Sequence, residues 1–222
     1  MEKKFILTDK FVINSFGIKL FQIKCTKSFK YAQKGDFGGY VEKEGNLDQE
    51  NDAWVFGNAR VFGNARVSSN ARVSGDAWVS DNARVSGDAW VSDNAWVSSN
   101  AWVSGDALVS GYAWVSGDAR VSGDARVSGD AWVSGNAWVS GDADIENDNE
   151  HCGFDGFGSC NRHTHAYMTK EKKVEIICGC FRGSIEEFEK KVEETHSGTV
   201  YEKQYKSIIN VIKIKFGLTD FT

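Results

Sequence analysis

Residues 75–92 read GDAWVSDNARVSGDAWVS, three copies of one six-residue unit, and this stretch decides the fold. The unit runs without insertion from Asn51 to Glu146, which makes sixteen hexads. Alanine holds the third place of every hexad, and valine holds the fifth until Ile145 replaces it in the last one. The fourth place varies and is Trp, Arg, Leu108 or Asp144. A fixed period of this kind predicts a solenoid, in which each repeat packs only against its neighbours.

Each hexad combines a short strand with a corner. Side chains alternate between the two faces of a strand, so Ala and Val are expected to point inward and the residue between them outward. The Gly-Asp or Gly-Asn pair that follows suits a turn, because Gly adopts any backbone angle and Asn and Asp tolerate the left-handed region. The regular aspartates could mimic a nucleic-acid backbone. We favour the simpler interpretation that Asn and Asp serve as corner residues.

The order of an aliphatic residue, turn residues and a small residue resembles the hexapeptide-repeat left-handed β-helix superfamily. The resemblance covers about 96 residues. In that superfamily three hexads form one triangular coil of eighteen residues, which implies about five coils here. The left hand comes from the resemblance and not from the period, so a right-handed solenoid stays open as the alternative.

The predicted fold is an all-β solenoid, a left-handed triangular β-helix of about five coils, with a different small unit at each end. Residues 1–40 are predicted to form a β-rich N-terminal cap, residues 41–150 the β-helix, and residues 151–222 an α+β domain. The coil is expected to start near Val41, with Phe56 and Phe62 lying under the cap. Strands of the cap are expected at Phe5–Leu7, Phe11–Ile13 and Ile18–Lys24, with a turn at Thr8–Lys10.

The C-terminal segment predicts a hairpin followed by two helices. The hairpin pairs Arg162–Met168 with Lys173–Cys178, and residues 153–158 are interpreted as a glycine-rich linker. Ser184 and Glu187 form a capping-box pattern that opens the first helix, which is expected to end near Thr195. The second helix is predicted over Tyr201–Lys215, where apolar residues recur at helical spacing.

A second resemblance covers nearly the whole chain. Residues 34–47 (KGDFGGYVEKEGNL), the Asn-Ala-Arg-Val hexads and residues 178–188 (CGCFRGSIEEF) resemble a phage and prophage family often labelled YdcK-like or polymer-forming. That resemblance implies a protein of viral origin in the cytoplasm of an infected or lysogenic bacterium. Some small phage proteins of this kind disable host immunity, which by analogy implies an anti-defence role.

Composition limits the class of partner. The net charge is −5, and residues 51–150 carry six Arg, no Lys and fourteen acidic residues, so direct nucleic-acid binding is not expected. No apolar run approaches the roughly 20 residues that span a bilayer, so no membrane contact is expected. The N-terminus is a poor match to a signal peptide, and the five cysteines are interpreted as thiols of a reducing cytoplasm.

Outward residues eighteen positions apart are expected to stack in columns. The first face then presents Arg60, Trp78, Trp96, Trp114 and Trp132; the second Arg66, Arg84, Trp102, Arg120 and Trp138; the third Trp54, Arg72, Trp90, Leu108, Arg126 and Asp144. Trp and Arg are enriched at binding hot spots, so we predict an interface on the first face and on Trp102, Trp138, Arg84 and Arg120 of the second. The first partner considered for this interface is another copy of the chain, in a dimer or trimer. The second is a host protein. The alternative is that the rings only stabilise neighbouring coils.

Chemistry-bearing residues are concentrated outside the hexads. Residues 51–146 contain no His and no Lys, whereas acyltransferases and γ-type carbonic anhydrases that resemble this fold use histidines on the coils, so no enzyme is expected. Six residues of the C-terminal segment could ligate zinc: Cys152, Cys160, Cys178, Cys180, His163 and His165. Their spacing matches no standard finger or ribbon, so we favour ordinary thiols and expect no cofactor.

The sequence thus predicts a non-enzymatic, phage-type interaction protein that binds and inhibits a host macromolecule, such as a nucleic-acid-binding defence protein. Two alternatives stay open. One is an oligomer that sequesters a small ligand or nucleotide, and the other is a structural component of a virion or cytoskeleton.

Overall fold

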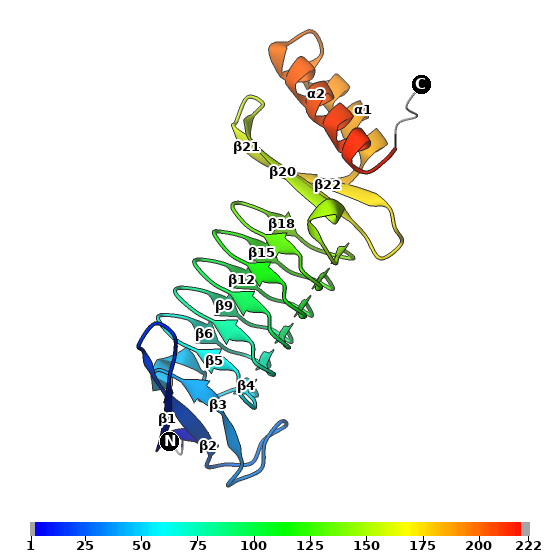
Figure 1. Ribbon diagram of the computed structural model, residues 1–222. Coiled ribbons are helices and arrows are strands. Elements are labelled where there is room, and N and C mark those ends of the chain that lie inside the picture. The colour runs from blue at the N-terminus through cyan, green and yellow to red at the C-terminus, as the bar shows by residue number, and fades with distance from the viewer. Residues whose placement is uncertain (1–2, 219–222) are drawn as a thin grey trace.

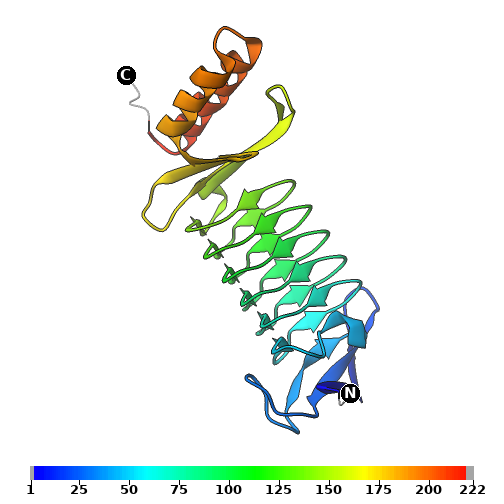
Figure 2. The same ribbon diagram turned by 180° about the vertical axis from the view of Figure 1, so that it is seen from behind.

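The computed structural model describes residues 3–218 and has the shape of a rod (Figure 1). Short strands are stacked in coils along its middle, with N-terminal strands at one end and a sheet carrying two helices at the other. Figure 2 shows the same order from behind. The predicted solenoid, with a strand-rich N-terminal region and an α+β C-terminal region, is therefore confirmed.

Three parallel sheets form the walls of the solenoid, and each hexad contributes one two-residue strand. The tryptophan face, named for its outward column, consists of β3 (Phe37–Val41), β5 (Arg60–Val61), β8 (Trp78–Val79), β11 (Trp96–Val97), β14 (Trp114–Val115) and β17 (Trp132–Val133). The arginine face consists of β6 (Arg66–Val67), β9 (Arg84–Val85), β12 (Trp102–Val103), β15 (Arg120–Val121) and β18 (Trp138–Val139). The mixed face consists of β4 (Trp54–Val55), β7 (Arg72–Val73), β10 (Trp90–Val91), β13 (Leu108–Val109), β16 (Arg126–Val127) and β19 (Asp144–Ile145).

The solenoid interior contains the alanine and the aliphatic residue of every hexad. None of these side chains is more than 3% exposed. The coils are joined by regular backbone hydrogen bonds: Trp78 N donates to Ala95 O and Ser80 N to Val97 O, both at 2.9 Å. Burying one valine contributes about 1.5–3 kcal/mol relative to leaving it exposed, so the repeated core is the main source of solenoid stability.

The solenoid has about six turns, one more than the hexad count predicts. The extra turn is built from residues outside the hexads. Tyr40 and Val41 of β3 pair in parallel with Arg60 and Val61, and Leu47 forms a bridge with Val67. The expected start of the coil near Val41 is confirmed.

The corners differ from the prediction in which residue is left-handed. In most corners glycine, the first residue of the pair, has positive φ, and Ser69, Asp81, Asp93 and Ser99 take that position in four others. The Asn or Asp that follows is not left-handed. Backbone tolerance therefore does not explain why Asn and Asp recur there, and their side-chain contacts, described below, supply another reason.

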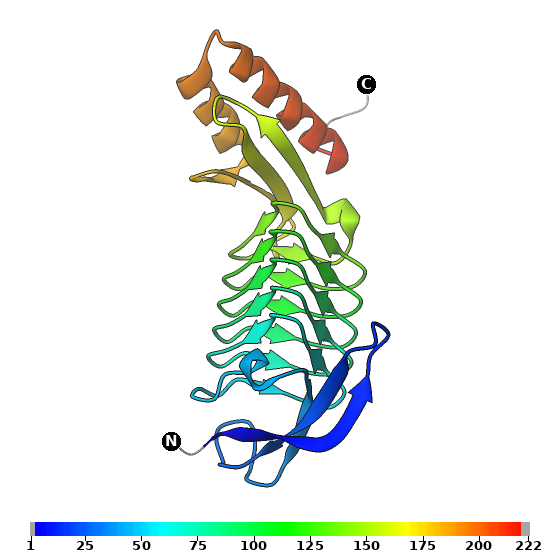
Figure 3. The same cartoon turned by 90° about the vertical axis from the view of Figure 1, so that its left-hand side faces the viewer.

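The N-terminal cap is an antiparallel hairpin that extends the tryptophan-face sheet. Strand β1 (Phe5–Ile13) pairs with β2 (Lys19–Cys25), which pairs with β3. The expected turn at Thr8–Lys10 is wrong: these residues lie inside β1, where the pairing register shifts between Leu7 and Phe11. Figure 3 shows the hairpin rising beside the first coils.

The cap covers the aromatic residues of the first hexads. Phe62 is buried with Leu20 and Tyr40, and Phe56 is partly buried against the core, so the prediction for both phenylalanines is confirmed. Trp54 is also buried, 6.3 Å from Phe5 and 5.3 Å from Phe29 between ring centroids. The cap thus shields the open end of the solenoid core, as repeat proteins require.

A four-stranded antiparallel sheet covers the other end, where a hairpin was predicted. Its strands are β20 (His151–Phe157), β21 (Arg162–Met168), β22 (Val174–Cys178) and β23 (Phe181–Ser184). The interpretation of residues 153–158 as a linker is wrong, because most of them belong to β20. Two further 3-10 turns, η1 (Glu44–Asn46) and η2 (Asp148–Glu150), lie near the two ends of the solenoid.

The sheet has two buried faces. Tyr167 and Ile177 pack onto the solenoid core, whereas Ala166 and Ile176 pack under the helices α1 (Ile185–His196) and α2 (Val200–Lys215). The predicted capping box is confirmed: Glu187 N donates to Ser184 Oγ, and Ser184 N donates to a carboxylate oxygen of Glu187. Neither helix within residues 3–218 combines the length and the apolar character that crossing a bilayer requires.

Candidate interaction faces

The tryptophan face carries a column of indoles in register. Trp78, Trp96, Trp114 and Trp132 are paired one above the other through β8, β11, β14 and β17. The rings of Trp96 and Trp114 are stacked with centroids 5.1 Å apart and planes at 7°, and those of Trp114 and Trp132 at 5.3 Å and 11°. The predicted column is therefore present, with parallel rings in its C-terminal part.

The N-terminal half of this column is covered by the protein itself. Phe16, in the turn of the β1–β2 hairpin, has its ring centroid 6.1 Å from that of Trp78 and 6.3 Å from that of Trp96. Arg60 places its guanidinium carbon 5.0 Å from the Trp78 ring centroid. Trp114 and Trp132, by contrast, are 38% and 51% exposed. The open apolar patch is thus smaller than the four tryptophans that the sequence suggests.

The polar group of each stacked indole is used inside the chain. Trp96, Trp114 and Trp132 donate from Nε1 to the serine hydroxyl one coil earlier at 3.1–3.4 Å; these serines are Ser80, Ser98 and Ser116. Since stacked rings cover one another's faces, mainly their edges reach solvent. The exposed surface is therefore apolar and has no free indole donor, which suits another protein surface better than a sugar or base that needs an open ring face.

The arginine face lies on a different wall of the rod. Trp102 and Trp138 are exposed and alternate with Arg84 and Arg120 in the strand register. Within residues 3–218 no arginine of the solenoid makes an ion pair. The nine predicted interface residues therefore form two separate surfaces rather than one.

The corner side chains form columns of their own. Asn64 donates to Asn82, Asn82 to Asn100 and Asn100 to Asp118, each from Nδ2 to Oδ1 at 3.0–3.2 Å. A second corner carries a row of aspartates eighteen residues apart: Asp88, Asp106, Asp124 and Asp142. One corner is thus a hydrogen-bonded amide ladder, and the other stacks like charges.

The six candidate zinc ligands are separated by the C-terminal sheet. His163 and His165 project from β21 toward the solenoid, where His165 Nδ1 lies 3.1 Å from Trp138 O. Cys152 and Cys178 pack on the opposite face with the helix core. Within residues 3–218 no group of three or more His, Cys, Asp or Glu side chains is arranged to hold a metal ion. The structure therefore does not bring the predicted set together.

Three histidines instead form a cluster at the junction between solenoid and sheet. His151 Nδ1 lies 3.2 Å from His165 Nε2, and the rings of His163 and His165 are 5.7 Å apart. His165 is buried, and this burial lowers its pKa to about 3. Its imidazole is neutral at physiological pH, which fits an Nδ1–H that donates to the Trp138 carbonyl and an Nε2 that accepts from His151.

Sequence reasoning missed the two features that shape the tryptophan face. The serine partners carry a signal in the sequence. A serine follows the valine of every hexad from Val67 to Val139, and it lies sixteen positions before the outward residue of the next coil in the same column. The covering Phe16 carries none, because its position depends on how the β1–β2 hairpin turns.

The comparisons with known proteins concern the hexads. A family model described as YdcK Beta solenoid repeat matches residues 65–81, 77–93, 101–117 and 119–135. No curated protein matches the chain. Together with the solenoid fold, the matched stretches support a YdcK-like solenoid family. The wider superfamily and the viral origin stay predictions.

Proposed function

We propose that the protein is a non-enzymatic binding protein whose solenoid presents the open half of the tryptophan face to a second copy of the chain. The observation that carries this proposal is the pair Trp114 and Trp132. Both indoles are exposed, stacked and already hydrogen-bonded through Nε1, so burying them in an interface removes apolar surface from water without losing a polar partner.

The foreign partner of this oligomer is, in our proposal, a basic host protein of the nucleic-acid-binding type. The excess of acidic residues in residues 51–150 and the row Asp88, Asp106, Asp124 and Asp142 support a positively charged partner. The resemblance to phage proteins supports inhibition as the outcome of binding.

The test replaces the two exposed indoles together, Trp114→Ala and Trp132→Ala, and measures the mass by sedimentation equilibrium. We expect an oligomer for the unchanged chain and a monomer for the double variant. Trp90→Ala is the matched control, because Trp90 is similarly exposed but lies on the mixed face. A monomeric unchanged chain, or a double variant with unchanged mass, overturns self-association through this face.

Affinity capture from bacterial lysate tests the second step. A stoichiometric basic protein that competes with nucleic acid supports inhibition of a host factor. Co-purification of a nucleotide without a protein overturns it in favour of sequestration.

A further inference from the structure

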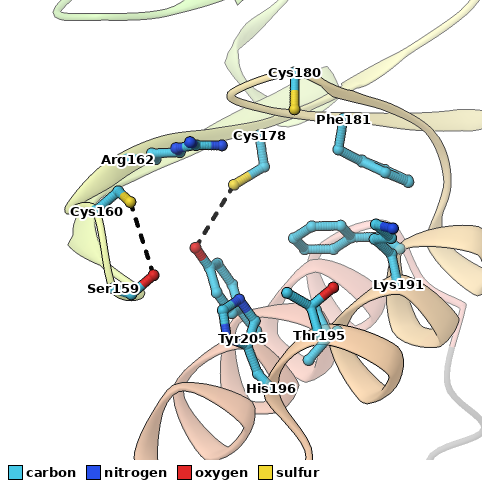
Figure 4. A pocket seen from close by; sticks show the side chains of 12 residues that line it. Ser159, Cys160, Arg162, Cys178, Cys180, Phe181, Lys191, Thr195, His196 and Tyr205 are labelled. Atoms are coloured by element: carbon cyan, nitrogen blue, oxygen red, sulfur yellow. Dashed lines mark hydrogen bonds between the residues drawn. The ribbon is translucent and has the colours of Figure 1, made fainter.

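Three of the five cysteines meet in one pocket of the C-terminal domain. Cys160, Cys178 and Cys180 line a cavity of about 240 Å³ between the sheet and the helices (Figure 4). Cys160 and Cys180 are exposed, whereas Cys178 is buried, accepts a hydrogen bond from Thr164 and lies 3.8 Å from Tyr205 Oη. Two thiols thus face solvent at the same opening.

Arg162 lies among these thiols. Figure 4 shows its side chain between Cys160 and Cys178, and the nearby sulfurs of Cys160 and Cys180 raise the pKa of its guanidinium. Within residues 3–218 no carboxylate forms an ion pair with Arg162. Gly179, at φ +60°, has no side chain, and a Cβ there would collide with the Arg162 side chain. The two-residue turn after β22 therefore leaves room for the guanidinium beside the thiols.

The rest of the pocket is basic and aromatic. Lys191 and His196 line it with Arg162, and none of its twelve lining residues is Asp or Glu. Phe181 and Phe188 form an apolar wall, with ring centroids 4.9 Å apart. In a chain of net charge −5, this opening is a local site for an anionic molecule with an apolar part.

We propose that this pocket is a thiol-exchange site, at which Cys160 or Cys180 reacts with a small disulfide that carries carboxylates. A guanidinium stabilises a neighbouring thiolate, which is the nucleophile in thiol–disulfide exchange. Arg162 and Lys191 also supply charge-assisted donors for the carboxylates of the incoming molecule.

The exchange needs no further reactant. The protein thiolate forms a new S–S bond with one sulfur of the small disulfide, and the original S–S bond breaks. The other sulfur leaves with the electron pair as a thiolate and takes a proton from water. The protein thiol is oxidised to a mixed disulfide and the small disulfide is the oxidant.

The test compares two small disulfides of opposite charge on the full chain, oxidised glutathione and cystamine, followed by intact mass and peptide mapping. We expect adducts on Cys160 or Cys180, and a rate with oxidised glutathione at least about tenfold that with cystamine, as one or two charge-assisted hydrogen bonds would provide. Arg162→Met should reduce this preference, with Lys191 left as the remaining donor for the carboxylates. Arg182→Met is the matched control, because Arg182 lies on β23 of the same sheet but pairs with Glu175 outside the pocket.

Three results overturn the proposal. One is an equal rate with both disulfides in the unchanged chain. Another is an adduct that persists at the same rate after Cys160→Ser and Cys180→Ser are combined. The third is an unchanged preference in Arg162→Met while its far-UV circular dichroism still matches the unchanged chain.

Discussion

The solenoid and the C-terminal domain build their cores in opposite ways. The solenoid repeats one buried pair, alanine and valine, sixteen times with a single Ile145. The C-terminal domain uses each contact once: Tyr167 Oη reaches both Ser140 O and Glu175 Oε1, and His165 lies between the Trp138 carbonyl and His151. Stability is therefore spread over many equal positions in the first region and depends on a few polar groups at the junction with the second.

The largest expected effect comes from placing a charge in either core. Val97→Asp buries an unpaired carboxylate in the middle of the solenoid and should cost more than about 4 kcal/mol, enough to unfold it. Ile209→Asp does the same under α1 and α2. All eight tryptophans lie within the hexads and both helices within residues 185–215, so tryptophan fluorescence follows the solenoid while far-UV circular dichroism follows the helices.

We expect Val97→Asp to change the fluorescence and Ile209→Asp to reduce the helical signal with the fluorescence unchanged. Arg126→Ala, an exposed change on the solenoid, is the control and should stay within about 0.5 kcal/mol of the unchanged chain. A fluorescence change in Ile209→Asp would mean that the two cores unfold as one unit, against the comparison above.

The second effect is a loss of junction stability in acid. Burial lowers the pKa of His165 to about 3, below its value near 6.5 in an unfolded chain, and burial also lowers the pKa of His151. The unfolded chain therefore takes up the proton first. The contribution of these neutral histidines to the free energy of unfolding is fully present above pH 6.5. It falls as the pH drops toward 3, by about 1.4 kcal/mol per pH unit for each such proton.

Urea unfolding of the C-terminal domain at a series of pH values between 7 and 4, roughly the window these pKa shifts define, measures this slope. His165→Gln should flatten it, because glutamine keeps hydrogen-bonding groups and does not titrate. Asp148 and Lys215 lie beside the cluster and His163 belongs to it, and the contributions of all three remain in both proteins. His196→Gln, outside the cluster, is the control and should leave the slope as it was. A slope that survives His165→Gln would assign the acid sensitivity to other groups.

The sequence predicts the solenoid in more detail than it predicts the two ends of the chain. The period alone assigns Ala95 and Val97 to the core and Trp96 to the outside, because successive side chains of a strand point to opposite faces. It cannot predict that Phe16 covers Trp78 and Trp96, since that contact joins residues more than sixty positions apart through a hairpin turn. Nor does it show that His165 of β21 and Cys178 of β22 lie on opposite faces of one sheet, because spacing alone does not define which elements cover a strand.

The smallest effect distinguishes two corners within the solenoid. Asn82 accepts from Asn64 and donates to Asn100, whereas Asp106 lies one coil from Asp88 and one from Asp124 in a row of carboxylates. Replacing Asn by Asp in the first row and Asp by Asn in the second should change the free energy of unfolding in opposite directions. Asn82→Asp removes the donor to Asn100, whose own amide already donates to Asp118, and should cost about 0.5–1 kcal/mol.

Asp106→Asn removes one charge from the middle of the row and supplies an amide donor to a neighbouring carboxylate. It should stabilise the solenoid by about 0.5 kcal/mol, and less at high salt because screening already weakens the repulsion. Fluorescence-monitored urea unfolding at low and high salt measures both exchanges. Equal signs would mean that corner side chains do not interact between coils. Opposite signs would show that the amide ladder stabilises the rod while the aspartate row lowers its stability. This is the pattern expected if the function of the aspartate row is to bind a positively charged partner.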